Sequence, residues 1–339
     1  MSPVNQLLAA AALAQGALGA NLLVSHFSGS VYSLSFSGSN TAGGSLSVTS
    51  QTGGCGLTPA WLQYYPDTRK VYCFDEAWFG WGTSAEYSVA NDGRLTQTGT
   101  LQTSGNSVHG ALTCRTRHEA HVDPTGQYII VPDLGADLLR VFRIDAATGA
   151  LTHCSDGQAA PGDGPRHIVF WKNGSGLQKA YVVNELANSV SAWDVDYAGG
   201  CLALNRTQTL STYAPGTSGG SATKAAEIRV VGNFLYASNR ADQTFGSEQD
   251  SIATYTIDEQ TGALAWLEAA NSYSYYPRTF EFNRDGTLVA VGGQTSSNVA
   301  IIARDPQTGR LGNLVANLQV GQRGRAGEED GLSAVVWVH

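Results

Sequence analysis

Charged side chains of a few kinds recur along this 339-residue sequence, and their types suit proton transfer and anion binding. Arginine presents several N–H donors in a planar fork that matches a carboxylate or a phosphate. Histidine titrates near neutral pH, and a neighbouring carboxylate can hold its ring in one tautomer. Together they predict acid–base chemistry on a small anionic substrate. The residues concerned are Arg166, Arg240, Arg278, Glu185, Asp133 and His118.

Aligning the successive hairpins of the sequence places these residues in two equivalent sets. The first set lies at the start of the innermost strand of each unit: His118, Arg166 and Arg278, with Ala60 and Ala226 at the same place. The second lies at the exit of the next strand: Glu76, Asp133, Glu185, Arg240 and Gln294. Because the two strands are antiparallel, both sets surround one mouth of a central channel. His167 and Arg229 complete the candidate substrate-binding set, which also holds Asp133, Arg278, Gln294 and Glu76.

A turn of the form (D/N)-x-x-(T/G)-G-x-L, often partly matched, recurs before a short strand. Its six occurrences end at Leu46, Leu95, Leu151, Leu202, Leu264 and Leu311. Spacings of about fifty residues fit one four-stranded propeller blade each. No segment beyond the first twenty residues keeps a 3.6-residue apolar period over three turns, so few helices are expected. The fold class is therefore all-β, a β-propeller of four-stranded antiparallel blades.

The two ends of this propeller are expected to pair with each other. Leu332 to Val338 reads as a strand with no turn motif after it, and Asn21 to Phe27 lacks an inner partner. Their pairing would close the ring and remove the exposed edges of an open sheet.

Composition and the first residues indicate an exported globular protein. The chain is 42% hydrophobic and 14% charged with a net charge of −8 and no basic run, which disfavours nucleic-acid or anionic-membrane partners. Residues 1–20 read as a signal peptide before a propeller domain of residues 21–339, the alternative being a short N-terminal helix. Their apolar run is too short to span a membrane. Two sequons, at Asn173 and Asn205, fit a secreted glycoprotein, with association to the cell wall as one option.

Five cysteines in an oxidising compartment allow up to two disulfides and leave one thiol over. Cys55 and Cys73 are closest in sequence, but the sequence does not give the connectivity. None has the C-x-x-C spacing of a zinc site. His118-Glu119-Ala120-His121 lacks the spacing and helix of a zinc protease, and Gly216 to Gly220 reads as a flexible loop rather than a nucleophile turn.

Several segments resemble the lactonase propeller family, which includes the bacterial type of 6-phosphogluconolactonase and the fungal carboxy-cis,cis-muconate cyclase. The segments are Val131 to Asp137, Gly164 to His167, Val183 to Leu186, Tyr236 to Arg240 and Val335 to His339. The resemblance implies active-site groups at His118, Arg166, Glu185 and Arg240, without metal or organic cofactor. His118 and Glu185 would relay the proton, either one as the acid, while the arginines hold the substrate carboxylate and the developing oxyanion.

The leading functional hypothesis is therefore a metal-independent enzyme that closes a lactone ring in a small anionic substrate, as the muconate cyclase does. Lactone hydrolysis of the 6-phosphogluconolactonase kind is its close alternative. A secreted or wall-bound binding protein without chemistry remains a rival, since propellers carry many functions and charged rings also act as salt bridges between blades. A third reading is a metal-dependent lactonase using Glu76, Asp133 and Glu185.

The blade count differs from that of the family. The family has seven blades, whereas six turn motifs occur here, and Leu101 to Arg117 is too short for the strands expected before His118. Either the ring has six blades or the chain lacks about one.

Overall fold

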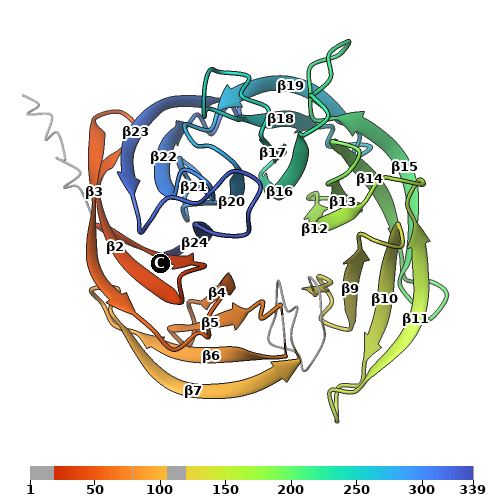
Figure 1. The fold of residues 1–339 in the computed structure, drawn as a ribbon. Helices are drawn as coiled ribbons and strands as arrows, with labels where there is room; N and C mark the ends of the chain where they lie inside the picture. Colours follow the sequence, from red (N-terminus) through yellow and green to blue (C-terminus); the bar gives the residue numbers. More distant parts are fainter. Residues whose placement is uncertain (1–18, 79, 105–119, 339) are drawn as a thin grey trace, which may run out of the picture.

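The computed structural model describes residues 19–78, 80–104 and 120–338, and this part of the chain is a ring of four-stranded antiparallel sheets around a central axis (Figure 1). Six such sheets are present among the described residues, and we name them blades A to F in ring order. The all-β propeller predicted from the turn motifs is thereby confirmed. The described residues contain no helix of the length and apolarity needed to cross a membrane.

The strands of each blade run from the channel outward. Blade A holds β24 (Leu332–Val338), β1 (Ala20–His26), β2 (Ser30–Ser39) and β3 (Gly43–Thr52). Blade B holds β4 (Pro59–Tyr65), β5 (Lys70–Asp75), β6 (Trp81–Val89) and β7 (Leu95–Ser104). Blade C holds β8 (His121–Val122), β9 (Tyr128–Asp133), β10 (Leu138–Ile144) and β11 (Leu151–Gln158).

The other three blades follow the same order. Blade D holds β12 (Pro165–Lys172), β13 (Gln178–Asn184), β14 (Ser189–Asp196) and β15 (Ala203–Ser211). Blade E holds β16 (Lys224–Val231), β17 (Phe234–Arg240), β18 (Ser251–Ile257) and β19 (Leu264–Asn271). Blade F holds β20 (Pro277–Phe282), β21 (Leu288–Gly293), β22 (Asn298–Arg304) and β23 (Leu311–Gln319).

The hydrophobic core lies between neighbouring blades rather than in one central mass. Strand β21 is buried along its whole length, whereas β3 at the outer rim is mostly exposed. One core cluster joins blades D and E through Trp171, Tyr181 and Tyr255, and similar clusters join A to B, F to A, C to D and E to F. Among the described residues no such cluster joins B to C, because the cluster at Ile129 and Val131 lies within blade C alone. Each fully buried side chain of this size contributes about 2 to 3 kcal/mol. Contact between neighbouring blades thus holds the ring together from blade C round to blade B.

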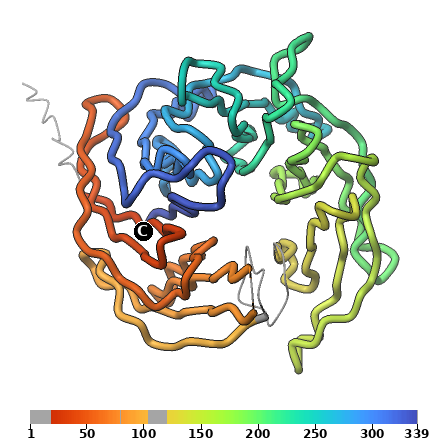
Figure 2. Tube along the Cα trace, in the orientation of Figure 1, coloured from red at the N-terminus to blue at the C-terminus, as the bar shows by residue number. Residues whose placement is uncertain are grey.

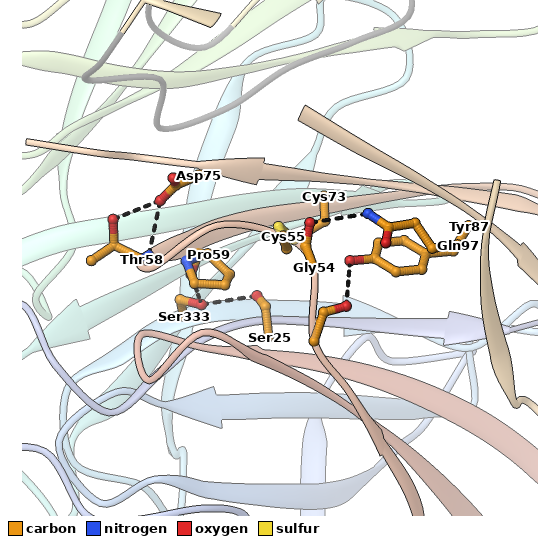
Figure 3. The surroundings of a disulfide bond; sticks show 11 residues. Ser25, Gly54, Cys55, Thr58, Pro59, Cys73, Asp75, Tyr87, Gln97 and Ser333 are labelled. Carbon is orange, nitrogen blue, oxygen red and sulfur yellow. Dashed lines mark hydrogen bonds between the residues drawn. A yellow bond between two sulfur atoms is a disulfide. The ribbon is translucent and has the colours of Figure 1, made fainter. Parts of the chain in front are cut away.

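Strands β1 and β24 pair in antiparallel register, Leu22 opposite Trp337, and this confirms the predicted closure. The Ser25 and Ser333 hydroxyls lie 2.8 Å apart, and Ser333 also donates to the carbonyl of Pro59 at the start of β4 (Figure 3). The Cα trace shows β24 at the inner end of the first blade (Figure 2). The closing strand β24 is therefore bonded both to β1 within blade A and to β4 of blade B.

Two disulfides brace the ring. Cys55, in the connection from blade A to blade B, is bonded to Cys73 of β5 with 5.8 Å between the Cα atoms (Figure 3). Cys154 of β11 is bonded to Cys201, just before β15, with 5.9 Å between the Cα atoms. The second bond links blade C to blade D. The fifth cysteine, Cys114, lies outside the described residues.

Blade C has the shortest inner strand in the described ring. β8 has two residues, whereas the inner strands of the other blades have six to eight. Residues 105–119, between the end of β7 and the start of β8, lie outside the described residues. His118 is one of them.

Candidate active site

The described members of the two residue sets aligned from the sequence lie at the same end of the blades. Arg166 and Arg278 are the second residues of the inner strands β12 and β20. Arg240 ends β17, and Glu185 and Gln294 directly follow β13 and β21. The strand registers place these positions together, with Pro165 opposite Asn184 and Lys224 opposite Arg240. We call this end of the channel the mouth.

A β-bulge marks the start of five inner strands. The register skips one residue at Ala60, at Arg166, at Arg278 and at Ser333, and two residues, Ala226 and Glu227, in β16. A bulged residue has no direct partner, and the local kink redirects its side chain. The side chains of Arg166 and Arg278 therefore need not follow the alternation between the two faces of the sheet that the other residues of their strands keep.

Glu185 binds three cations at the mouth. Its Oε2 lies 2.8 Å from Arg166 Nη1, and its Oε1 lies 2.9 Å from Arg240 Nη2 and 3.6 Å from Lys224 Nζ. The Glu185 side chain is 9% exposed and that of Arg240 is 3% exposed. Burial by itself raises the pKa of the Glu185 carboxyl, but the Arg166, Arg240 and Lys224 charges outweigh it and lower that pKa to about 2. Glu185 is therefore a permanent anion that orients two guanidinium groups.

The chain before Arg166 forms a tight turn against Glu185. Gly164 has a φ of +62°, and its carbonyl accepts the Glu185 N–H at 2.8 Å. The Asp137 carboxylate accepts the N–H groups of Gly162 and Gly164, each at 2.8 Å. Arg166 and Glu185 are thus fixed by one turn although 19 residues separate them.

Arg240 is the most deeply buried cation of the mouth. It donates to the Ala225 carbonyl at 3.3 Å, and its guanidinium carbon is 4.9 Å from the centre of the Tyr276 ring. Burial lowers the pKa of Arg240, the negative charge of Glu185 raises it, and the positive charge of Arg166 lowers it further. A guanidinium stays charged through such a shift because its ordinary pKa is above 12. The mouth therefore keeps a desolvated positive charge, supported by a carboxylate and an aromatic face.

Arg278 forms the other half of the mouth. Its Nη1 lies 2.9 Å from Glu329, in the connection between β23 and β24, and 3.5 Å from the Gln294 Oε1. Its Nη2 lies 3.9 Å from Glu76 Oε2, and the Phe27 ring is 5.3 Å from the guanidinium carbon. Arg278 thus joins blades F, A and B.

Three predicted residues lie apart from these contacts. Asp133, at the exit of β9, pairs with Arg140 of its own blade at 2.7 Å. His167 of β12 is buried and stacks on Trp61 of β4 in blade B, with 5.8 Å between ring centres. Arg229 lies toward the opposite end of β16, where it pairs with Glu227 at 2.5 Å and Glu281 at 3.0 Å. The mouth therefore gathers Glu76, Arg166, Glu185, Arg240, Arg278 and Gln294.

Sequence reasoning missed Lys224, Tyr276 and Glu329. Lys224 faces Arg240 across the strand pair, so its position two residues before Ala226 was a usable signal. Tyr276 and Glu329 come from connections between strands, where no repeat marks them.

The described residues contain no group of three or more His, Cys, Asp or Glu that could hold a metal ion. The metal-binding alternative needed Glu76, Asp133 and Glu185 together. Their geometry does not fit it, because Asp133 faces Arg140 and both Glu185 oxygens face guanidinium nitrogens.

Known proteins resemble this chain along most of its length. The 35% identical "Probable 6-phosphogluconolactonase" of Arthroderma benhamiae aligns over 237 residues, 69% of this chain and 59% of that protein. The 6-phosphogluconolactonase of Bacillus subtilis is 32% identical over 204 residues, 60% of this chain and 54% of that protein. The chain thus matches somewhat more than half the length of these curated relatives.

Solved structures show the same fold at lower identity. The periplasmic gluconolactonase of Pseudomonas aeruginosa superposes with a TM-score of 0.76 at 23% identity, covering 95% of this chain and 99% of that one. A putative 6-phosphogluconolactonase from Bacteroides uniformis superposes with a TM-score of 0.77 at 18% identity, covering 94% of this chain and 99% of that one.

The family model described as "Lactonase, 7-bladed beta-propeller" matches residues 21–117 and 113–326. These two stretches meet between β7 and β8, the place where the sequence lacks room for a full set of strands. With most of its length matched, the chain belongs to the lactonase family of seven-bladed β-propellers.

Proposed function

We propose that the mouth hydrolyses a small lactone that carries a negative charge. The observation that carries this proposal is the buried clamp in which Glu185 holds the Arg166 and Arg240 guanidinium groups. Relatives named 6-phosphogluconolactonase favour the opening of a lactone over the ring closure expected from the muconate cyclase resemblance. A phosphorylated sugar lactone is accordingly the first substrate to test.

The clamp suits the charge that develops during lactone opening. Attack of water on the carbonyl carbon places a negative charge on the carbonyl oxygen, and the product bears a carboxylate. Preorganised guanidinium donors in a desolvated site stabilise both. With its lowered pKa, Glu185 is a weak proton acceptor, so its role is to hold the donors in place. The predicted share of His118 in proton transfer stays a prediction, since that residue lies outside the described residues.

The test is turnover by the purified protein of 6-phosphogluconolactone, gluconolactone and carboxymuconate. Arg166→Ala and Arg240→Ala are expected to lower kcat/KM by about 10²–10³, the usual effect of losing an oxyanion donor. Arg140→Ala is the matched control, because Arg140 pairs with Asp133 of its own blade and makes no contact with Glu185. Absence of turnover on all three substrates would remove the proposal. Anion or glycan binding without turnover would then favour a binding protein.

We also propose that the chain is exported. The apolar pattern of residues 1–20 and two disulfides support this, and Asn205 of the second sequon is exposed on β15. Expression in a fungal host should release a protein whose mass falls on deglycosylation, with any wall-bound fraction extractable by salt. Retention in the cytosol without modification would contradict it.

A further inference from the structure

Glu76 is the second carboxylate of the mouth, and its surroundings are opposite to those of Glu185. It follows β5, and its side chain is 13% exposed. Its Oε2 is buried and accepts no hydrogen bond from the described residues, the nearest cation atom being Arg278 Nη2 at 3.9 Å. Glu185, in contrast, has both oxygens within 3 Å of a guanidinium nitrogen. Glu76 therefore has an oxygen available to a further partner at the mouth.

The groups around Glu76 come from four parts of the ring. Arg278 of β20 and Glu329 of the β23–β24 connection face it, the Trp78 side chain donates a hydrogen bond to it, and Arg166 of β12 acts from further away. The neighbouring Asp75 turns away, because its carboxylate accepts both the N–H and the hydroxyl of Thr58 (Figure 3). Glu76 is thus the acid on blade B that faces the arginines.

These neighbours set the proton affinity of Glu76. Burial raises the pKa of the Glu76 carboxyl, Arg278 opposes this, and Glu329 adds to the rise. The pKa of Glu185 moves the other way, to about 2. Two carboxyl groups whose pKa values are pushed apart within one site commonly divide the roles of proton carrier and permanent charge.

We propose that Glu76 is the general base that activates water for attack on the lactone carbonyl. This role rests on the proposed function. In the step, the Glu76 carboxylate removes a proton from water while the water oxygen forms a bond to the carbonyl carbon, and the carbonyl electrons move to its oxygen. When the tetrahedral intermediate collapses, the ring C–O bond breaks and Glu76 returns the proton to the leaving oxygen. Lactone and water thus become a hydroxy acid, which loses its carboxyl proton to solvent, and the arginine clamp holds the resulting carboxylate.

The experiment compares Glu76→Gln with the wild type in initial rates from pH 4 to 8, after subtraction of spontaneous hydrolysis. The wild-type kcat/KM should rise with pH through an apparent pKa above the ordinary value for Glu, because only the ionised base works. Glu76→Gln should lower kcat by about 10²–10⁴, the usual share of a general base, and abolish that rise. KM and the affinity for the hydroxy acid product should change little, since the clamp is intact.

Glu328→Gln is the matched control, because the same chemical change falls on a side chain that is 58% exposed and faces Arg325. It should keep the wild-type rate and pH profile. Glu76→Asp retains a carboxyl and should restore part of the rate together with the pH dependence, which guards against a fold defect in Glu76→Gln.

Two outcomes separate the proposals. An active wild type whose Glu76→Gln variant keeps its rate and its rise with pH overturns the role of Glu76 alone. A wild type that opens no lactone overturns the proposed function beneath it.

Discussion

Glu185 neutralises part of the positive charge of Arg166 and Arg240, two guanidinium groups that are largely buried. Arg240 is only 3% exposed, and Arg166, at the start of the inner strand of the neighbouring blade D, binds the same carboxylate. Breaking a buried ion pair by removing one partner typically costs about 3–5 kcal/mol, because the remaining charge stays desolvated. The carboxylate therefore matters for stability as well as for the shape of the mouth.

Glu185→Gln is expected to lower the free energy of unfolding by about 3 kcal/mol near neutral pH, measured by urea denaturation. The folded-state pKa of about 2 lies below the unfolded value near 4.5, so the stabilisation is complete above pH 5 and is lost as pH falls toward 2. The difference between wild type and variant should shrink over that interval.

Glu86 provides the control for this measurement. The Lys70, Tyr72 and Thr98 hydrogen bonds also lower its pKa to about 2, yet its side chain is 24% exposed, against 9% for Glu185. Water screens such a charge, so Glu86→Gln should cost much less. An equal loss in the two variants would contradict the importance of burial at Glu185.

At the residue scale, the blade alignment could place side chains in a ring but could not say what each one contacts. Glu185 and Arg240 hold equivalent positions, and they meet because they come from adjacent blades. Asp133 holds the same kind of position but turns to Arg140, since that arginine stands nearby on the next strand. Glu329 enters from a connection outside the repeat. Such choices depend on side-chain packing, which the repeat pattern does not encode.

The turn before β12 is the element that joins sequence motif and site. Gly164 adopts a positive φ, and a Cβ added there would lie 2.5 Å from Leu186 Cγ. Gly162, two residues earlier, has a φ of +81° with nothing within 4 Å of an added Cβ. Both N–H groups bind Asp137, so the two glycines differ mainly in the space beside them.

Gly162→Ala should therefore show only the cost of a positive φ, about 1 kcal/mol in the free energy of unfolding. Gly164→Ala should cost about 2–3 kcal/mol because Leu186 must also move. It should lower kcat/KM as well, since the turn positions both Arg166 and Glu185. Equal stabilities and equal rates in the two variants would contradict this prediction, because they would mean that the Leu186 side chain moves aside without cost.

At the element scale, the hairpins and their turns were predictable because Gly and Asp mark each turn and β-branched residues fill the strands. The bulges were not, because Ala60, Ala226 and the two arginines share no residue type that would signal one. Their common position is visible only in the register of paired strands.

Across the whole molecule, disulfides join parts that the strand ladders leave separate. The Cys154–Cys201 bond spans 47 residues and links blade C to blade D, whereas Cys55–Cys73 spans 18 within the region of blade B. From the loop-closure entropy that each bond removes from the unfolded chain, the two disulfides are expected to stabilise the fold by about 4 and 3 kcal/mol, respectively.

The double variant Cys154→Ser/Cys201→Ser should thus unfold at a lower urea concentration, with a loss of about 4 kcal/mol. Adding a reductant to that variant should lower its stability by a further 3 kcal/mol or so, through the remaining bond. A variant as stable as the wild type would mean that the blades need no covalent link there.

The sequence predicted the propeller and its closure because each blade repeats one pattern and the two end strands lack partners elsewhere. It also located the shortage of chain before His118. What fills that part of the ring could not be predicted, since the family has seven blades and the described residues form six. Repeat counting reports how many units the chain contains, while the packing of neighbouring blades determines how the ring adapts to that number.

The pairing of β1 with β24 has a consequence for synthesis. Ser25 and Ser333 meet across 308 residues, so the inner edge of β1 has no partner until the last strand leaves the ribosome. At common elongation rates this delay is roughly 15 to 60 s. During that time an open strand edge is available to other nascent chains, and the protein is expected to depend on a chaperone that shields it.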